Sequence, residues 1–235
     1  MKKTVTILLL LAAASGAATA QDRLESTVSA DFVSQYVWRG LDLGGASLQP
    51  SLGVSYKGLS LSAWGSTGLT DPADTREVDL TLDYTAGGLQ FGVTDYWFNA
   101  GPDQLNRYLH YASNSTNHVF EAFAGYDFGP VFIQWFTNFA GADGVNAAGK
   151  RAYSSYFEIG IPFTTGEVEW AAAAGAVPFG TDFYGNERFV VTNLSLTASK
   201  AIEAGGTFRI PLSAGFVVNP YSGQAFLVFG LTIQP

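Results

Sequence analysis

A strict alternation of apolar and polar side chains, beginning at Leu24, constrains the fold of this chain more than any other feature. Over residues 24–39 one alternate set is mostly apolar and ends in two aromatic residues. The other set is mostly polar and includes Glu25 and Asp31. Successive side chains of a β-strand point to opposite faces, so the pattern predicts a strand with one apolar and one polar face.

The same two-faced pattern recurs along the rest of the chain, and turn residues separate the repeats. We expect twelve strands, at residues 24–39, 47–57, 59–66, 76–85, 89–97, 118–128, 131–139, 153–161, 167–174, 189–197, 207–216 and 224–234. Connections after the odd-numbered strands are long, and those after the even-numbered strands are short. Membrane barrels alternate long outward loops with tight periplasmic turns, and their strands need ~10 residues to cross a bilayer.

The predicted fold is therefore an all-β, transmembrane, antiparallel up-and-down β-barrel, with both termini on the periplasmic side. A soluble β-domain is the alternative, since it could show the same alternation. Pro211 lies within a predicted strand and cannot donate a ladder hydrogen bond, so we expect a bulge or an unpaired carbonyl there.

The first 20 residues have the character of a secretory leader. Lys2 and Lys3 precede an apolar run at 5–14, and small residues at 18–20 precede Gln21. The run is too short for a helical span, which needs ~20 residues. We predict a signal peptide at 1–20 and a barrel domain at 21–235, with a retained anchor as the alternative. The absence of cysteine excludes a lipoprotein anchor and disulfides.

The charge balance points away from nucleic acid and towards an enclosed polar interior. Without the two leader lysines, the chain has 10 Lys+Arg and 20 Asp+Glu, a formal charge of −10. Charged residues make up 14% of the sequence, against roughly 25% in soluble domains. The polar face is mainly Gly, Ser, Thr, Asn and Gln, which suits a wet lumen. We therefore expect an outer-membrane location, with lipid and lipopolysaccharide as surroundings.

Charged residues in the strands are expected to face the lumen, because an Arg or Lys facing lipid costs ~2–4 kcal/mol at mid-bilayer. The candidate pore-lining residues are Asp31, Arg39, Glu77, Asp79, Asp83, Glu121, Glu158, Glu169 and Arg209. Their excess of acid would favour cations in an open lumen. Alternatively, the acids pair with Arg209, Lys57 or tyrosine hydroxyls and plug the interior. We expect the connection at 99–117 to fold inwards as a constriction.

The sequence offers little support for an enzyme, a metal site or a cofactor. His110 and His118 are the only histidines, and Ser113 and Ser115 near His110 form the only serine–histidine proximity. This proximity falls in a connection rich in small polar residues, so we interpret it as loop surface. Two histidines eight residues apart are no stronger as a metal site.

Residues 28–40 resemble the opening motif of the TorF-type porin family. The motif has a Ser-x-Asn/Asp step, a Ser-x-Tyr step and an Arg-Gly pair, which correspond here to 29–31, 34–36 and Arg39-Gly40. The resemblance implies a Gram-negative outer-membrane barrel that acts as a porin. Many outer-membrane barrels end in an aromatic residue, whereas this sequence ends in Ile233-Gln234-Pro235.

From these features we predict a passive, cation-leaning channel for small polar solutes or ions. The alternative is a non-conducting, plugged barrel with a structural, adhesive or partner-binding role.

Overall fold

The computed structural model describes residues 23–71, 73–99, 106–112, 115–204 and 208–234. The predicted leader, residues 1–20, lies outside the described residues. Among the described residues, no helix is long and apolar enough to cross a membrane.

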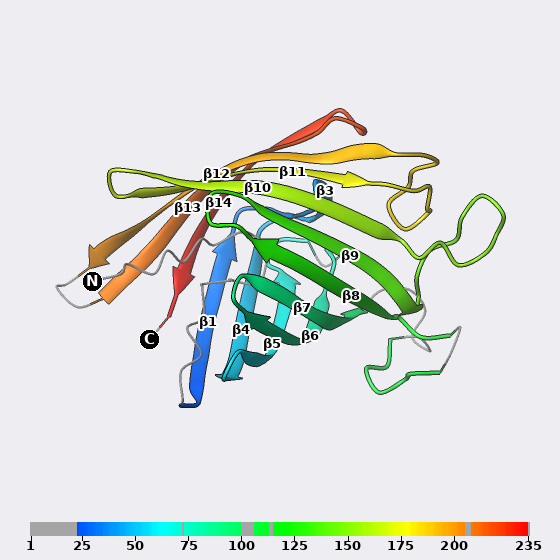
Figure 1. Cartoon of the computed structure of the whole chain (residues 1–235), viewed down its shortest axis with the longest axis horizontal. Coiled ribbons are helices and arrows are strands. Elements are labelled where there is room, and N and C mark those ends of the chain that lie inside the picture. The colour runs from blue at the N-terminus through cyan, green and yellow to red at the C-terminus, as the bar shows by residue number, and fades with distance from the viewer. Residues whose placement is uncertain (1–22, 72, 100–105, 113–114, 205–207, 235) are drawn as a thin grey trace.

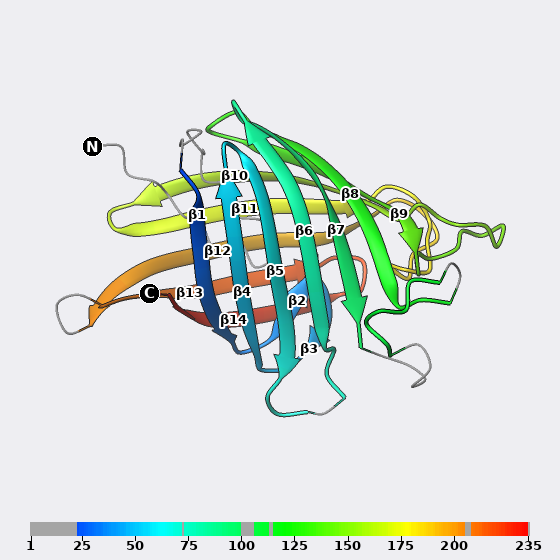
Figure 2. The same cartoon turned by 90° about the horizontal axis from the view of Figure 1, so that it is seen from below.

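Twelve antiparallel strands close into one barrel, and a two-stranded hairpin accompanies them (Figures 1 and 2). The wall strands are β1 (Glu25–Val33), β4 (Ser47–Tyr56), β5 (Leu59–Gly68), β6 (Glu77–Ala86), β7 (Leu89–Phe98), β8 (His118–Asp127), β9 (Phe132–Gly141), β10 (Ser155–Thr165), β11 (Val168–Val177), β12 (Val190–Ala204), β13 (Phe208–Asn219) and β14 (Gln224–Ile233). The hairpin consists of β2 (Tyr36–Trp38) and β3 (Leu41–Gly44). Neighbours in sequence are neighbours in the wall, and β14 pairs with β1 to close it. The predicted up-and-down barrel is confirmed.

The outer surface of the barrel is apolar on all sides. Exposed large apolar side chains include Val28, Leu52, Val54, Leu61, Leu80, Leu82, Phe91, Val93, Ile159, Ile161, Leu194, Leu196, Leu212, Phe216, Phe229 and Leu231. With Tyr126 on β8 and with Trp135 and Phe139 on β9, they come from eleven of the twelve wall strands. The largest apolar patch on a typical soluble monomer covers only roughly 300–600 Å². A continuous apolar belt of this kind is suited to a hydrocarbon solvent.

Tight turns join the strands at one end, as the sequence predicts. Two of these turns consist of two residues with positive φ. The values are 51° and 86° for Lys57-Gly58, and 57° and 87° for Gly87-Gly88. Two positive φ values are the requirement of a type I′ hairpin turn, whose twist matches that of the flanking strands. This end of the barrel is called the short-turn end below, and the opposite end the long-loop end.

One sequence prediction about strand geometry is wrong, and a second is wrong about a bulge at Pro211. The first wall strand ends at Val33 rather than at residue 39. The Ser34 backbone amide makes the last bond to β14, and the chain then leaves the wall. Alternation alone could not reveal this exit, since β2 continues with extended backbone. The pairing of β12 with β13 also runs past Pro211 with no register shift, so there is no bulge. Instead, the β13–β14 ladder begins at Leu212, which places the proline just beyond that ladder.

Candidate functional site

The β2–β3 hairpin is the feature that most affects the interior, because it folds into the lumen at the long-loop end. Its tip is Arg39-Gly40, with φ values of 52° and 80°, again the type I′ combination. A Cβ on Gly40 would collide with the backbone carbonyl of Thr192 on β12. The Gly40 carbonyl also accepts a hydrogen bond from Asn219 Nδ2 at 3.0 Å. Only glycine permits this close approach to the wall.

Arg39 ties the hairpin to the far wall through a buried ion pair. Its two guanidinium nitrogens donate to both carboxylate oxygens of Glu121 on β8, at 2.7 and 2.9 Å. The side chains are 7% and 1% exposed. Arg39 Nη1 also donates to the Tyr184 hydroxyl at 2.6 Å. Burial lowers the pKa of Arg39, but the adjacent Glu121 carboxylate outweighs that effect and raises the pKa well above its usual range.

Aromatic rings enclose this ion pair. The Arg39 guanidinium carbon lies 4.3, 4.1 and 4.7 Å from the ring centroids of Trp38, Phe136 and Tyr156. Cation–π contacts of this kind are strongest when water is excluded. Trp38 in turn stacks on Tyr184 at 5.9 Å, so the β11–β12 connection closes over the hairpin tip.

A second tie joins the base of the hairpin to β6. The Tyr36 hydroxyl donates to Glu77 at 2.6 Å, and the Tyr36 side chain is buried against Trp64 at a ring distance of 5.7 Å. Burial raises the pKa of Tyr36 well above its usual range, and the nearby Glu77 charge raises it further. Asp79 lies next along the same face and is also buried.

The other face of the hairpin is equally covered. Val37 packs with Val33, Val217, Phe226 and Val228 in an apolar cluster on β1, β13 and β14. With Tyr36 and Trp38 facing β6 and the β11–β12 connection, both faces of β2 are buried. The hairpin is therefore packed as part of the interior.

Burial of the inward side chains varies around the wall. Inward residues on β7 to β10 and on β12 are buried, among them Gln90, Thr94, Asn138, Glu158 and Asn193. Inward positions on β4, β5 and the middle of β6 are small and polar, and they are only half-buried, for example Ser51, Gly53, Ser62 and Thr81. The interior is thus more densely filled beside β7 to β10 than beside β4 and β5.

The structure locates each of the predicted pore-lining residues. Arg39 and Glu121 form the buried ion pair, and Glu77 accepts the hydrogen bond from the Tyr36 hydroxyl. Asp31 accepts a hydrogen bond from the Thr232 hydroxyl at 2.6 Å. Glu158 accepts from the Tyr156 hydroxyl at 2.7 Å and from Asn193 Nδ2 at 3.3 Å.

The other members of that set are less tightly held. Asp79 follows Glu77 on the buried face, and Asp83 lies 3.5 Å from the Gln90 amide. Glu169 is half-buried near the short-turn end of β11. Arg209 is 72% exposed and lies 3.5 Å from Glu203, away from the other charges.

The connection at 99–117 does not fold inwards in its described residues, 106–112 and 115–117, contrary to the expectation. These residues cover the outward face of β7 and β8. His118 contacts Asp95 through Nδ1 at 2.7 Å and donates from Nε2 to the Tyr108 carbonyl at 2.6 Å. Tyr111 stacks on the His118 ring at 4.1 Å. His118 is thus an anchor for a loop on the outer wall. The inward segment is the β2–β3 hairpin.

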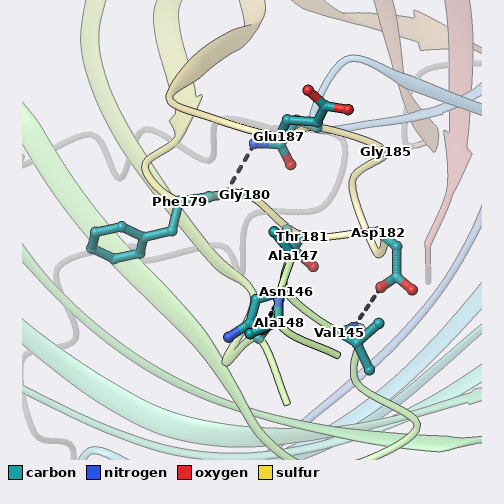
Figure 3. A pocket seen from close by; sticks show the side chains of 12 residues that line it. Val145, Asn146, Ala147, Ala148, Phe179, Gly180, Thr181, Asp182, Gly185 and Glu187 are labelled. Carbon is teal, nitrogen blue, oxygen red and sulfur yellow. Dashed lines mark hydrogen bonds between the residues drawn. The ribbon is translucent and has the colours of Figure 1, made fainter. Parts of the chain in front are cut away.

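An open depression of about 990 Å³ lies between the β9–β10 and β11–β12 connections. Figure 3 shows Asp182 directed at Val145, whose amide donates to Asp182 Oδ1 at 2.6 Å. Ser154 and Thr181 hydroxyls also meet at 2.6 Å. These bonds fasten the two connections together, which supports Tyr184 in its place over the hairpin tip.

Sequence reasoning missed Tyr36, Trp38 and Tyr184 as members of the site. It treated the first two as aromatics near the end of a wall strand. The available signal was Arg39-Gly40, a pair that suits a two-residue turn only if both residues take positive φ.

Comparisons with known proteins do not assign a family. No family model matches the sequence, and no curated protein matches it.

Proposed function

We propose that this protein is an outer-membrane channel for small polar solutes or ions, held closed by the β2–β3 hairpin in the conformation described here. The observation that carries the proposal is the buried Arg39–Glu121 pair, which fixes an inserted segment across the interior of an apolar-coated barrel. Separating a buried ion pair leaves each charge without its partner, which is costly, so the pair favours the docked position of the hairpin.

Three observations support placement in the outer membrane. The wall is a closed barrel, which leaves no unpaired sheet edges along most of its height. Its outer surface is apolar around the circumference, and the sequence opens with a stretch that has the character of a leader. Arg76 and Arg188 are exposed near the long-loop end, where they could pair with lipopolysaccharide phosphates. The resemblance of residues 28–40 to TorF-type porins agrees with this placement.

The lumen-facing acids support a preference for cations. Arg39 neutralises one of them, Glu121. Glu77, Asp79, Asp83 and Glu158 also line the interior. With the hairpin displaced, these carboxylates would border the pathway and concentrate cations there.

The second candidate is a barrel that never conducts and that acts through its loops. The burial of both faces of β2 favours it, because a permanently packed segment is a plug. Liposome swelling separates the two candidates. Folded protein, residues 21–235, is reconstituted with sugars of increasing size, and reversal potentials are measured in asymmetric salt.

Slow, size-limited swelling with a cation-selective potential supports the channel. Inserted protein that gives neither signal, in the wild type or with the hairpin deleted, supports the non-conducting barrel. Anion selectivity would keep the channel but contradict the role given to the acids.

A further inference from the structure

Two acidic side chains lie next to each other on the lumen face of β6 without a basic partner. Glu77 and Asp79 flank the outward-facing Val78, so they point to the same side, and each is only 4% exposed. Arg39 is bound to Glu121, and no Lys, Arg or His of the described residues forms an ion pair with either acid. Burying an unpaired charge is costly, so the two carboxyl groups need a proton or a cation to neutralise them.

A proton satisfies only part of this site. A hydrogen bond links the two carboxyl groups, which places a proton on one of them, and the Tyr36 hydroxyl donates to Glu77. Asp79 Oδ1 is nevertheless buried and accepts no hydrogen bond from the described residues. A buried acceptor without a donor has lost its hydration and gained nothing in exchange.

A further oxygen faces the same place from the neighbouring strand. Ser66 on β5 lies directly opposite Glu77 in the ladder and is 5% exposed on the lumen face. Its hydroxyl oxygen is buried and, within the described part of the chain, has no hydrogen-bond partner. The Cβ atoms of directly opposed residues are about 5 Å apart, so the Ser66 hydroxyl and the Glu77 carboxylate can contact one ion between them.

These oxygens are the ligands that a hard cation prefers. Ca²⁺ accepts carboxylates, other oxygens and water in a flexible geometry, whereas Mg²⁺ demands a near-ideal octahedron and gives up its water reluctantly. No group of three or more His, Cys, Asp or Glu side chains in the described residues is placed to hold a metal ion. A site with two carboxylates and one hydroxyl therefore needs water to complete the coordination, and it binds weakly.

We propose that Glu77, Asp79 and Ser66 form a binding site for a divalent cation of the calcium type inside the lumen. When the ion binds, the shared proton leaves to solvent, both carboxylates are charged, and the ion neutralises them. The dissociation constant is expected on the order of 10⁻⁴–10⁻³ M, the range of weak oxygen sites. The site gives the cation preference a defined location, and in this respect alone the inference rests on the proposed function.

Terbium luminescence tests the proposal, because Tb³⁺ takes the oxygen ligands of Ca²⁺ and emits when an excited tryptophan nearby transfers energy to it. Trp64 lies directly opposite Asp79 in the β5–β6 ladder. Residues 21–235 are refolded in detergent with Tb³⁺ present, so that the ion does not have to pass the docked hairpin. Tryptophan-sensitised emission is expected, Ca²⁺ should displace it, and Trp64→Phe should reduce it several-fold.

Matched variants identify the ligands. Asp79→Asn and Glu77→Gln keep the size of each side chain and remove its charge, so each should abolish the emission. Ser66→Ala should weaken Tb³⁺ binding by up to about 10-fold. Ser62→Ala removes a hydroxyl from the same face of the same strand, opposite Thr81, and should leave the binding curve unchanged.

Several results would overturn the proposal. Wild-type protein without sensitised emission would mean that the two acids only share a proton. Emission that persists in Asp79→Asn, or that does not change in Trp64→Phe, would place the ion elsewhere. Identical binding curves for Ser66→Ala and Ser62→Ala would remove the hydroxyl from the site.

Every protein is checked for folding by heat-modifiable migration before the measurement. The readout is ion binding in detergent and does not depend on conductance. Failure of the cation-site proposal is therefore distinguishable from failure of the channel proposal.

Discussion

Replacing Arg39 by alanine should release the hairpin and leave the barrel wall intact. The substitution removes both hydrogen bonds to Glu121 and leaves that carboxylate buried without its counter-charge. Removing one partner of a buried ion pair typically costs about 3–5 kcal/mol. The wall strands keep their ladders, so the cost falls mainly on the docked state of the hairpin. If all of it does, the equilibrium between docked and undocked hairpin shifts by about 100-fold or more.

The assay follows a single cysteine at Val37, which is 5% exposed when the hairpin is docked. Maleimide labelling of Val37→Cys should be slow alone and about 100-fold faster when combined with Arg39→Ala. Arg107→Ala, an exposed arginine on the outer-wall loop, is the matched control and should leave the rate unchanged.

A compensating double variant tests the physical reason for release. Arg39→Met with Glu121→Met replaces the ion pair by apolar groups of similar size, a change that is often neutral in buried sites. Slow labelling should therefore return. If Arg39→Ala labels no faster than its parent, the ion pair does not hold the hairpin and the reasoning is refuted.

Four other perturbations follow from the same contacts. Gly40→Ala should prevent docking, because its Cβ would meet a β12 carbonyl, and fast labelling of the hairpin cysteine would show it. His118→Ala should expose the outer-wall loop to proteolysis without changing ion flux, since its contacts lie outside the lumen. Asp79→Asn with Asp83→Asn should reduce cation preference, and an unchanged reversal potential would remove both from the pathway. Because the pKa of Tyr36 is raised, its protonated hydroxyl stabilises the docked hairpin fully below the ordinary tyrosine pKa of about 10, and this stabilisation is lost only as pH rises above that value; the ratio of the labelling rates with and without Arg39→Ala should therefore stay constant below pH 10.

The barrel could be predicted because the alternation of polar and apolar residues within each strand indicates which side chains face inward and which face outward. Residues 77–85 alternate acids and threonines with apolar residues, and the structure turns the first set inward and the second outward. Turn pairs such as Lys57-Gly58 mark where the wall reverses. The alternation of apolar and polar residues and the turn residues between strands depend only on residues close in sequence, so a single sequence is enough to identify them.

The insertion of the hairpin into the lumen could not be predicted, because it depends on contacts between residues that are distant in sequence. Arg39 lies 82 positions from Glu121 and 145 from Tyr184. The extended backbone of Tyr36–Trp38 looks the same whether it continues a wall strand or enters the lumen. Tyr36 and Trp38 were expected to end a wall strand, and instead they lie beside the hairpin tip, where Trp38 contacts Arg39.

The misplaced constriction has a related cause. The connection at 99–117 is the longest, and its length suggested an inward fold. In the structure His118 is on the outward face of β8, and its ring packs against Tyr108 and Tyr111 on that side. The face that a strand-end residue occupies, not the length of the loop, determined where the described part of the connection packs.

Single-channel recording of wild-type protein beside Arg39→Ala tests the central claim most directly. Both proteins, as residues 21–235, are inserted into planar bilayers after heat-modifiable migration shows that they are folded. The closed-hairpin account predicts rare or very small steps for the wild type, and frequent, larger, cation-selective steps for Arg39→Ala. Large, frequent steps from the wild type, or two silent proteins, would contradict it.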